Sequence, residues 1–269
     1  MKTHVRTLQL SLFICLFLLC SSSWATHISG GYIAYKWLQR NDYEITVGLF
    51  YDIGGVPVVP EQQVFIYGIE AQQIMLPLRK YMNPKPGSQV GLALYSTIYT
   101  FPEVSFFGGV RNKIAVRIDN RSGNILNMFS SINTSFYIET EIYVNSFLGI
   151  NSSAAPADTM ASVSGKVNKA LTADLSSIDP DGDSLVYKLI TPMQNAWRNV
   201  EGYRSPEFLC TDCTFTLNPQ TGQLTWNKPV LQGAYAIAVM VEEWRKIPGT
   251  SQSLRMGYTI KDILLVISD

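Results

Sequence analysis

The chain has 269 residues, of which 46% are hydrophobic and only 16% are charged, and its formal net charge is zero. This length allows one large domain or two small ones, each with a core of its own. Because the chain lacks the basic surplus that is typical of nucleic-acid-binding proteins, we expect no nucleic-acid partner.

The first 25 residues have the pattern of a signal peptide. Two basic residues near the start form a positive n-region, an apolar run covers residues 8–19, and residues 23–25 match a small-x-small cleavage motif. Cleavage between Ala25 and Thr26 is therefore predicted. The mature chain would be secreted or displayed at the cell surface.

Two other interpretations of this segment remain open. In the first, Cys20 is lipidated and the protein is an anchored lipoprotein, although the bulky Leu19 stands where a small residue is expected. In the second, the apolar run is a membrane anchor, although it is shorter than the ~20 residues that a spanning helix needs. No later stretch is apolar enough to span a membrane, so we expect no transmembrane segment in the mature chain.

Residues 26–150 predict an N-terminal β-sandwich domain. The segment Tyr43 to Asp52 alternates apolar and polar residues, which is typical of a strand with one buried face. With the segment Tyr32 to Gln39 it predicts a hairpin around a polar turn at residues 40–42. Further strands are expected at residues 63–69, 92–101, 113–119 and 136–144.

A linker of small and polar residues follows Gly149 and predicts a domain boundary there. Residues 151–269 then predict a C-terminal immunoglobulin- or cadherin-like β-sandwich domain. Its strands are expected at residues 184–191, 214–217, 223–226, 235–244 and 255–267. The predicted fold class is therefore all-β, with two β-sandwich domains after the signal peptide.

Cys210 and Cys213 are the cysteines that remain after removal of the signal peptide. A structural zinc site needs about four ligands, and His27 is the only histidine of the mature chain, far away in sequence. In an exported protein this spacing favours a small disulfide that tightens a loop, with free thiols as the alternative.

Three carboxylates, those of Asp179, Asp181 and Asp183, alternate with turn residues just before a predicted strand. Ionised carboxylates this close repel one another, and calcium is a hard cation that takes oxygen ligands of this kind. One hypothesis is therefore a cadherin-like calcium site completed by other parts of the chain. The alternative is a solvated turn in which the aspartates cap backbone amides; no cofactor is then required.

A set of short motifs, in a specific order over nearly the whole mature chain, carries a family resemblance. The motifs are residues 26–32, 43–47, 123–128, 136–140, 179–183, 241–245 and 261–263. They are similar to those of large secreted surface proteins of Bacteroidetes, many of which carry gliding-motility-associated or type IX secretion domains. The resemblance implies surface display and immunoglobulin- or cadherin-like modules, but no known activity.

The sequence offers little for catalysis, and we expect no enzyme. His27 alone would have to serve as the base of a Ser-His-Asp triad. Glu242 and Glu243 are adjacent on a predicted strand, so they point to opposite faces and cannot together flank one glycosidic bond. We expect them to be structural, paired with Arg245 or Lys261.

Two classes of function follow. The favoured one is a non-enzymatic exported surface or adhesin-like protein, built of β-sandwich modules that bind a protein or glycan at the cell surface. The alternative is a carbohydrate-binding or glycosidase-like accessory protein. Most tryptophans are expected to be core or half-buried, with an aromatic sugar platform as the alternative; they are Trp37, Trp197, Trp226 and Trp244. Convergence of two carboxylates in a deep pocket would favour the second class.

Overall fold

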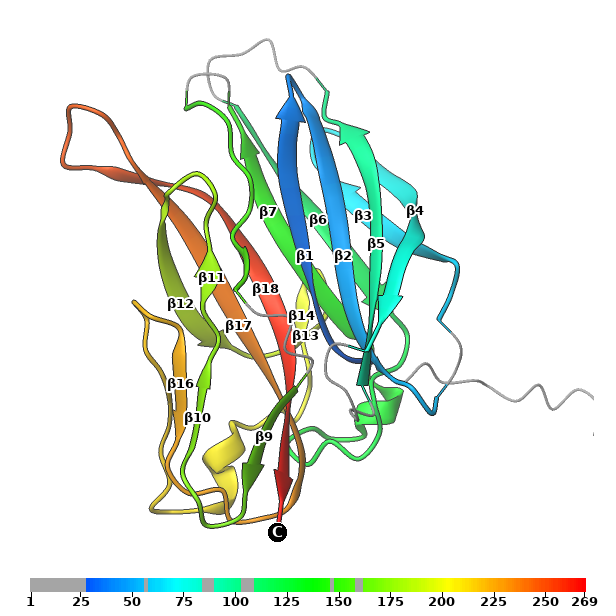
Figure 1. Cartoon of the computed structure of the whole chain (residues 1–269), viewed down its shortest axis with the longest axis vertical. Helices are drawn as coiled ribbons and strands as arrows, with labels where there is room; N and C mark the ends of the chain where they lie inside the picture. Colours follow the sequence, from blue (N-terminus) through cyan, green and yellow to red (C-terminus); the bar gives the residue numbers. More distant parts are fainter. Residues whose placement is uncertain (1–27, 56–57, 84–89, 103–108, 146–147, 158–161) are drawn as a thin grey trace, which may run out of the picture.

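The computed structural model describes residues 28–55, 58–83, 90–102, 109–145, 148–157 and 162–269, and this part is almost entirely β-structure. Its helices are two short 3-10 turns, η1 (Ser131–Asn133) and η2 (Pro206–Leu209). No helix in the described residues is long and apolar enough to cross a membrane. The predicted all-β sandwich fold is confirmed (Figure 1).

Seven strands of the first half and one strand of the second half form a closed ring in the order β18-β1-β2-β5-β4-β3-β6-β7. The ring closes because β7 pairs with β18 as well as with β6. The strands are β1 (Ile28–Gln39), β2 (Asp42–Asp52), β3 (Glu61–Tyr67), β4 (Ala71–Met82), β5 (Val90–Thr100), β6 (Val110–Ile118), β7 (Phe136–Val144) and β18 (Ser253–Ser268).

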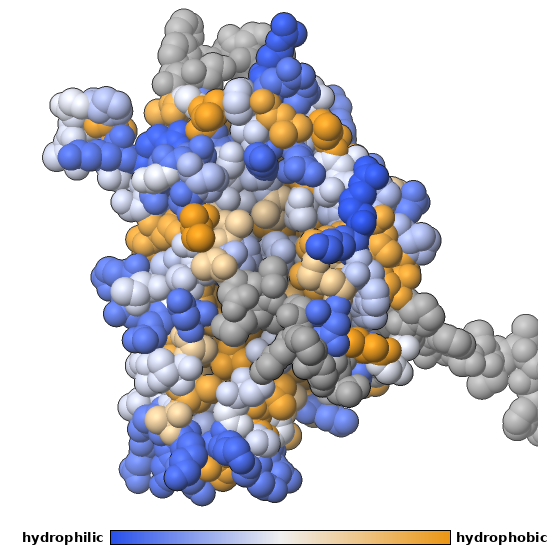
Figure 2. Space-filling view, in the orientation of Figure 1, coloured by the Kyte–Doolittle hydropathy of each residue, from blue (hydrophilic) through white to orange (hydrophobic). Residues whose placement is uncertain are grey.

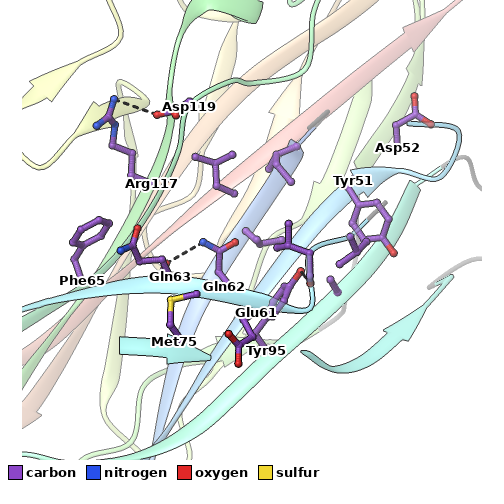
Figure 3. Close-up of a pocket in the computed structure, with 16 residues that line it drawn as sticks. Tyr51, Asp52, Glu61, Gln62, Gln63, Phe65, Met75, Tyr95, Arg117 and Asp119 are labelled. Carbon is purple, nitrogen blue, oxygen red and sulfur yellow. Dashed lines mark hydrogen bonds and ion pairs between the residues drawn. The ribbon is translucent and has the colours of Figure 1, made fainter. Parts of the chain in front are cut away.

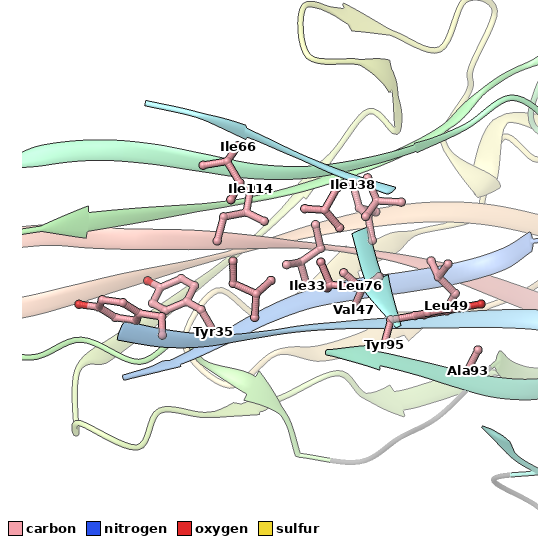
Figure 4. Packing of buried hydrophobic residues seen from close by; sticks show 14 of the residues in the cluster. Ile33, Tyr35, Val47, Leu49, Ile66, Leu76, Ala93, Tyr95, Ile114 and Ile138 are labelled. Atoms are coloured by element: carbon pink, nitrogen blue, oxygen red, sulfur yellow. The ribbon is translucent and has the colours of Figure 1, made fainter. Parts of the chain in front are cut away.

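The ring is flattened into a sandwich with a core of buried hydrophobic side chains, drawn in Figure 4. Ile33, Val47 and Tyr95 from one layer pack with Ile66 and Ile138 from the other, and each of these side chains is almost fully buried. These residues hold alternate positions in their strands, as the period of two requires for a half-buried sheet.

The second half is a smaller sandwich. A sheet of β12, β17, β18 and β9 faces the three strands β10, β16 and β15, with Trp226 at the centre of the core between them. The strands are β8 (Ala155–Pro156), β9 (Ser162–Lys166), β10 (Leu171–Asp174), β11 (Ser177–Ile178), β12 (Ser184–Ile190), β13 (Met193–Asn195), β14 (Arg198–Asn199), β15 (Phe215–Leu217), β16 (Gln223–Trp226) and β17 (Gly233–Lys246).

Strand β18 belongs to both sandwiches. Its residues Gly257 to Thr259 pair with β7, and Asp262 pairs with Gly31 of β1. Its last five residues pair with β9, and β17 accompanies it along nearly its whole length. The two cores lie on either side of the predicted boundary at Gly149, but a single strand is hydrogen-bonded into both halves. The division into two domains at this boundary stays a prediction.

The predicted strands of the first half recur with ends within two residues, except that β1 begins four residues and β6 three residues earlier than predicted. Strand β4 was not predicted. Strand β4 is mostly polar at its start and contains Pro77, so its alternation is weak. In the second half, the short strands β8 to β11, β13 and β14 were also missed, because two to five residues are too few for a periodic signal.

Candidate functional site

A pocket lies where strands β3 and β6 separate. These strands pair only from Phe65 with Ala115 to Tyr67 with Lys113. Toward Glu61, β3 continues beside β4 alone, while β6 continues beside β7 alone. The gap leads into the sandwich and has a volume of about 410 Å³, which is within the range of ligand-binding pockets. We call it the seam pocket; Figure 3 shows the residues that line it.

The interior of the seam pocket is apolar. Strands β1, β2 and β5 of the opposite layer supply its floor, with Ile28, Leu49, Ala93 and Tyr95. These side chains point inward because they hold the core-facing positions of their strands, and they are buried. The separation of β3 from β6 places the pocket directly beside these buried side chains.

The rim of the seam pocket is polar and mainly acidic. The carboxylates of Asp52, Glu61 and Asp119 and the guanidinium of Arg117 lie there. Arg117 is already within 3.5 Å of Asp119, and Asp52 accepts a 3.0 Å hydrogen bond from the amide of Gly54. Figure 3 places Asp52, Glu61 and Asp119 on different sides of the opening. The rim therefore carries excess negative charge without an arrangement of two converging carboxylates.

The sequence-predicted calcium ligands lie elsewhere, in the loop before β12. The Oδ1 atom of Asp179 accepts hydrogen bonds from the amides of Asp181 and Asp183, at 2.9 and 3.0 Å. The Oδ2 atom of Asp181 accepts one from the amide of Ser152 at 2.5 Å, and Gly182 takes a left-handed conformation. This is the geometry of the capped turn that was the alternative to a calcium site.

Arg245 of β17 supplies the positive charge that this acidic loop needs. Its Nε and Nη2 atoms each donate a 2.7 Å hydrogen bond to the Asp183 carboxylate. The same guanidinium donates to the carbonyls of Leu148 and Ile150 and to the side chain of Asn151. Within the described residues, no group of three or more His, Cys, Asp or Glu side chains is placed to hold a metal ion.

Burial raises the pKa of the Asp179 carboxyl, although its two amide donors oppose this shift. Its Oδ2 atom is buried and has no hydrogen-bond partner in the described part of the chain. The loop thus carries one carboxyl whose charge is poorly compensated, because Arg245 binds its neighbour Asp183 instead.

Glu242 and Glu243 do point to opposite faces, but their predicted partners were wrong. Glu242 forms ion pairs with Lys188 at 2.8 Å and Arg255 at 3.5 Å. Glu243 faces the linker instead and is fully buried; Ala154, Asn151 and Tyr35 each donate a hydrogen bond to it. Burial raises the pKa of Glu243 to about 7.

Lys261 also lacks the glutamate partner that the sequence predicted. Its ammonium group donates hydrogen bonds to the carbonyls of Leu175 and Ser176, at 3.0 and 3.2 Å. Burial lowers the pKa of Lys261 to about 8, and Asp174 only partly offsets this effect. The small pocket beside it, about 40 Å³, has room for about one water molecule.

Cys210 and Cys213 are joined by a disulfide in an exposed loop, which agrees with the pairing that their spacing favours. Trp226 is buried in the core of the second sandwich as expected, but Trp197 is not. Its side chain is 87% exposed at the tip of the β13–β14 hairpin. The predicted cleavage site at Ala25 and Thr26, with Cys20 and His27, lies outside the described residues.

The residues of the seam pocket were not singled out from the sequence. Glu61, Gln63 and Arg117 are ordinary outward residues of two strands, and their distance in sequence gives no local pattern. The only sequence signal was indirect: a carboxylate begins β3, and another follows directly after β6. No protein-family model matches the chain, and no curated protein matches its sequence.

Proposed function

We propose that the chain is a non-enzymatic exported surface or adhesin-like protein that binds a protein or glycan partner at the cell surface. Its architecture is that of β-sandwich interaction modules, as in the secreted Bacteroidetes surface proteins that its motifs resemble. The observation that carries the proposal is the seam pocket: an apolar interior open to the side, with carboxylates set apart around the rim. Such a site is suited to binding, since most glycosidases use two carboxyl groups that flank the scissile bond.

The way the two sandwiches are joined supports a display role. A strand hydrogen-bonded into both halves limits their relative motion, because any rotation would break its ladder with β7 or with β9. Figure 2 gives a second indication. On the face drawn there, apolar and hydrophilic areas are interspersed, as is usual for a protein surface exposed to water.

The proposal is tested by locating the full chain in its own host. We expect the exported protein to begin at Thr26 by intact-mass analysis and to be degraded when whole cells are treated with protease. If Cys20 is found to be acylated, the protein is the lipoprotein of the alternative interpretation and not the form cleaved before Thr26. An uncleaved chain that stays inside intact cells would overturn the proposal.

A carbohydrate-binding or glycosidase-like role is the second candidate, and the exposed Trp197 is the observation that favours it. An accessible indole ring is a surface on which sugar rings stack, and the ammonium of Lys113 lies 5.9 Å from its centre. A glycan array with the wild type, Trp197→Ala and the exposed-residue control Ile98→Ala tests this role. Signal that is lost only in Trp197→Ala would support it.

A further inference from the structure

We propose that the seam between β3 and β6 accepts an extended segment of a partner protein as an added strand. An apolar side chain of that segment would enter the seam pocket, and its basic side chains would lie at the acidic rim. This inference rests on the proposed partner-binding function and names the chemistry of the partner.

The first argument is the interrupted register of the two strands. Had the pairing continued beyond Phe65 and Ala115, Gln63 would lie opposite Arg117 and Glu61 opposite Asp119. These pairs are not formed, although Glu61 and Gln63 lie in β3 and pair with β4, and Arg117 lies in β6 and pairs with β7. Each therefore presents a strand edge to the seam within the described part of the chain, and such an edge is a template for another chain.

The second argument explains why the seam does not close on itself. Continued pairing would set the carboxylates of Glu61 and Asp119 directly opposite one another, and like charges in that position destabilise a ladder. Glu61 forms no ion pair with any described residue. Arg117 pairs with Asp119, and a basic residue of an inserted strand would supply the cation that Glu61 lacks.

The third argument is the match between the pocket and the proposed occupant. Side chains of an added strand alternate between the two faces, so one apolar side chain would point toward Leu49 and Ala93 while its neighbours face the solvent. Those neighbours would meet Glu61, an outward residue of β3 whose charge is not neutralised by Arg117 because that residue already pairs with Asp119. Two sides of the opening are the parts of β3 and β6 that do not pair with each other, which favours a strand over a compact small molecule.

The test uses the full mature chain and three blocked heptapeptides as probes, with binding measured by calorimetry and by backbone NMR. In the first peptide lysine and valine alternate. In the second, glutamate replaces lysine. The third has the sequence of the first but carries N-methyl groups at every second residue, which removes main-chain donors and keeps the side chains.

We expect the lysine–valine peptide to bind and to perturb the amides of Gln62 to Val64 and of Arg117. We expect the glutamate peptide not to bind, and N-methylation to weaken binding by about ten-fold or more because several main-chain hydrogen bonds are lost. Glu61→Gln should weaken binding about two- to five-fold, as for loss of one exposed ion pair. The matched control Glu70→Gln, on the same hairpin but outside the pocket, should bind as the wild type does.

Equal binding of the N-methylated peptide would overturn strand addition and leave only side-chain contacts. The proposal would also be overturned if Glu61→Gln bound the peptide as well as the wild type does. The same holds if the lysine–valine peptide did not bind at millimolar concentration, or if it perturbed only the amides of other strands. These outcomes are separate from the proposed function, since export and surface exposure are measured on cells and do not depend on the seam.

Discussion

The backbone amide of Ala154 donates a 2.7 Å hydrogen bond to the Oε1 atom of Glu243, and this contact ties the linker between the sandwiches to strand β17. Asn151 and Tyr35 donate to the other oxygen of the same carboxyl, so the linker, β1 and β17 meet at one buried group. The neighbouring Arg245 holds the linker carbonyls of Leu148 and Ile150. The connection between the sandwiches is thus built from polar contacts as well as from strand pairing.

Stability should fall as the pH rises through the titration of Glu243. Burial raises its pKa from 4.5 to about 7, so the unfolded chain loses this proton before the folded chain does. The contribution of Glu243 to the free energy of unfolding is therefore fully present below about pH 4.5. It falls by roughly 3 kcal/mol as the pH rises to about 7. Urea unfolding across this range measures the slope.

The variant Glu243→Gln keeps the shape of the side chain but cannot titrate, so its stability should change less over the same pH range. Glu70→Gln should keep the wild-type dependence, because Glu70 is exposed on a hairpin turn. Parallel stability curves for the wild type and Glu243→Gln would show that other groups cause the pH dependence.

Gly257→Ala should loosen the contact between the sandwiches. A Cβ on Gly257 would collide with the backbone carbonyl of Glu141 and would lie 2.9 Å from the hydroxyl of Tyr35, so β18 and β7 would have to separate. We expect a loss of about 1–3 kcal/mol in the free energy of unfolding. Gly54→Ala, where a Cβ meets no atom closer than 3.6 Å, should stay within about 0.5 kcal/mol of the wild type. Equal stability of the two variants would show that the close approach of β18 to β7 at Gly257 does not contribute to stability.

Arg245→Met should destabilise the chain by about 2–4 kcal/mol, because it leaves the buried Asp183 carboxylate unpaired and releases the linker carbonyls. Lys246→Met removes an exposed cation from the next position of the same strand and serves as the control. Chemical unfolding of both variants measures the difference. A loss below about 0.5 kcal/mol for Arg245→Met would mean that water replaces the guanidinium without cost.

The aspartate loop before β12 should not respond to calcium. Its carboxylates already bind Arg245 and backbone amides, so a metal ion would have to displace them. We therefore expect the same melting temperature in millimolar calcium and in chelator. A site present only in the folded state would instead add ~2.7 kcal/mol at a hundred times its dissociation constant. A rise that Asp181→Asn abolishes would establish the calcium site.

The fragment of residues 26–150 should not fold alone. Without β18, the ring of the first sandwich is open between β1 and β7, and both strands gain a free edge. We expect a poorly dispersed NMR spectrum for the fragment and a well-dispersed one for residues 26–269. A folded fragment would show that the first sandwich is independent of β18, as the linker composition predicts.

The sequence by itself determined the local structure of this protein. The alternation of Phe136, Ile138 and Ile142 with polar neighbours predicted β7 to its exact ends, because the period of two acts within a few residues. The same local chemistry predicted the capped turn at Asp179 as an alternative, and the spacing of Cys210 and Cys213 favoured their disulfide.

The tertiary structure alone decided how these elements are joined. Tyr35 and Glu243 are 208 residues apart, and no local pattern indicates that they share a hydrogen bond. The sharing of β18, the exposure of Trp197 and the parting of β3 from β6 likewise depend on contacts between distant strands. Periodicity specifies which face of a strand is buried, but the choice of neighbour depends on how whole strands pack, and that is a property of the folded chain.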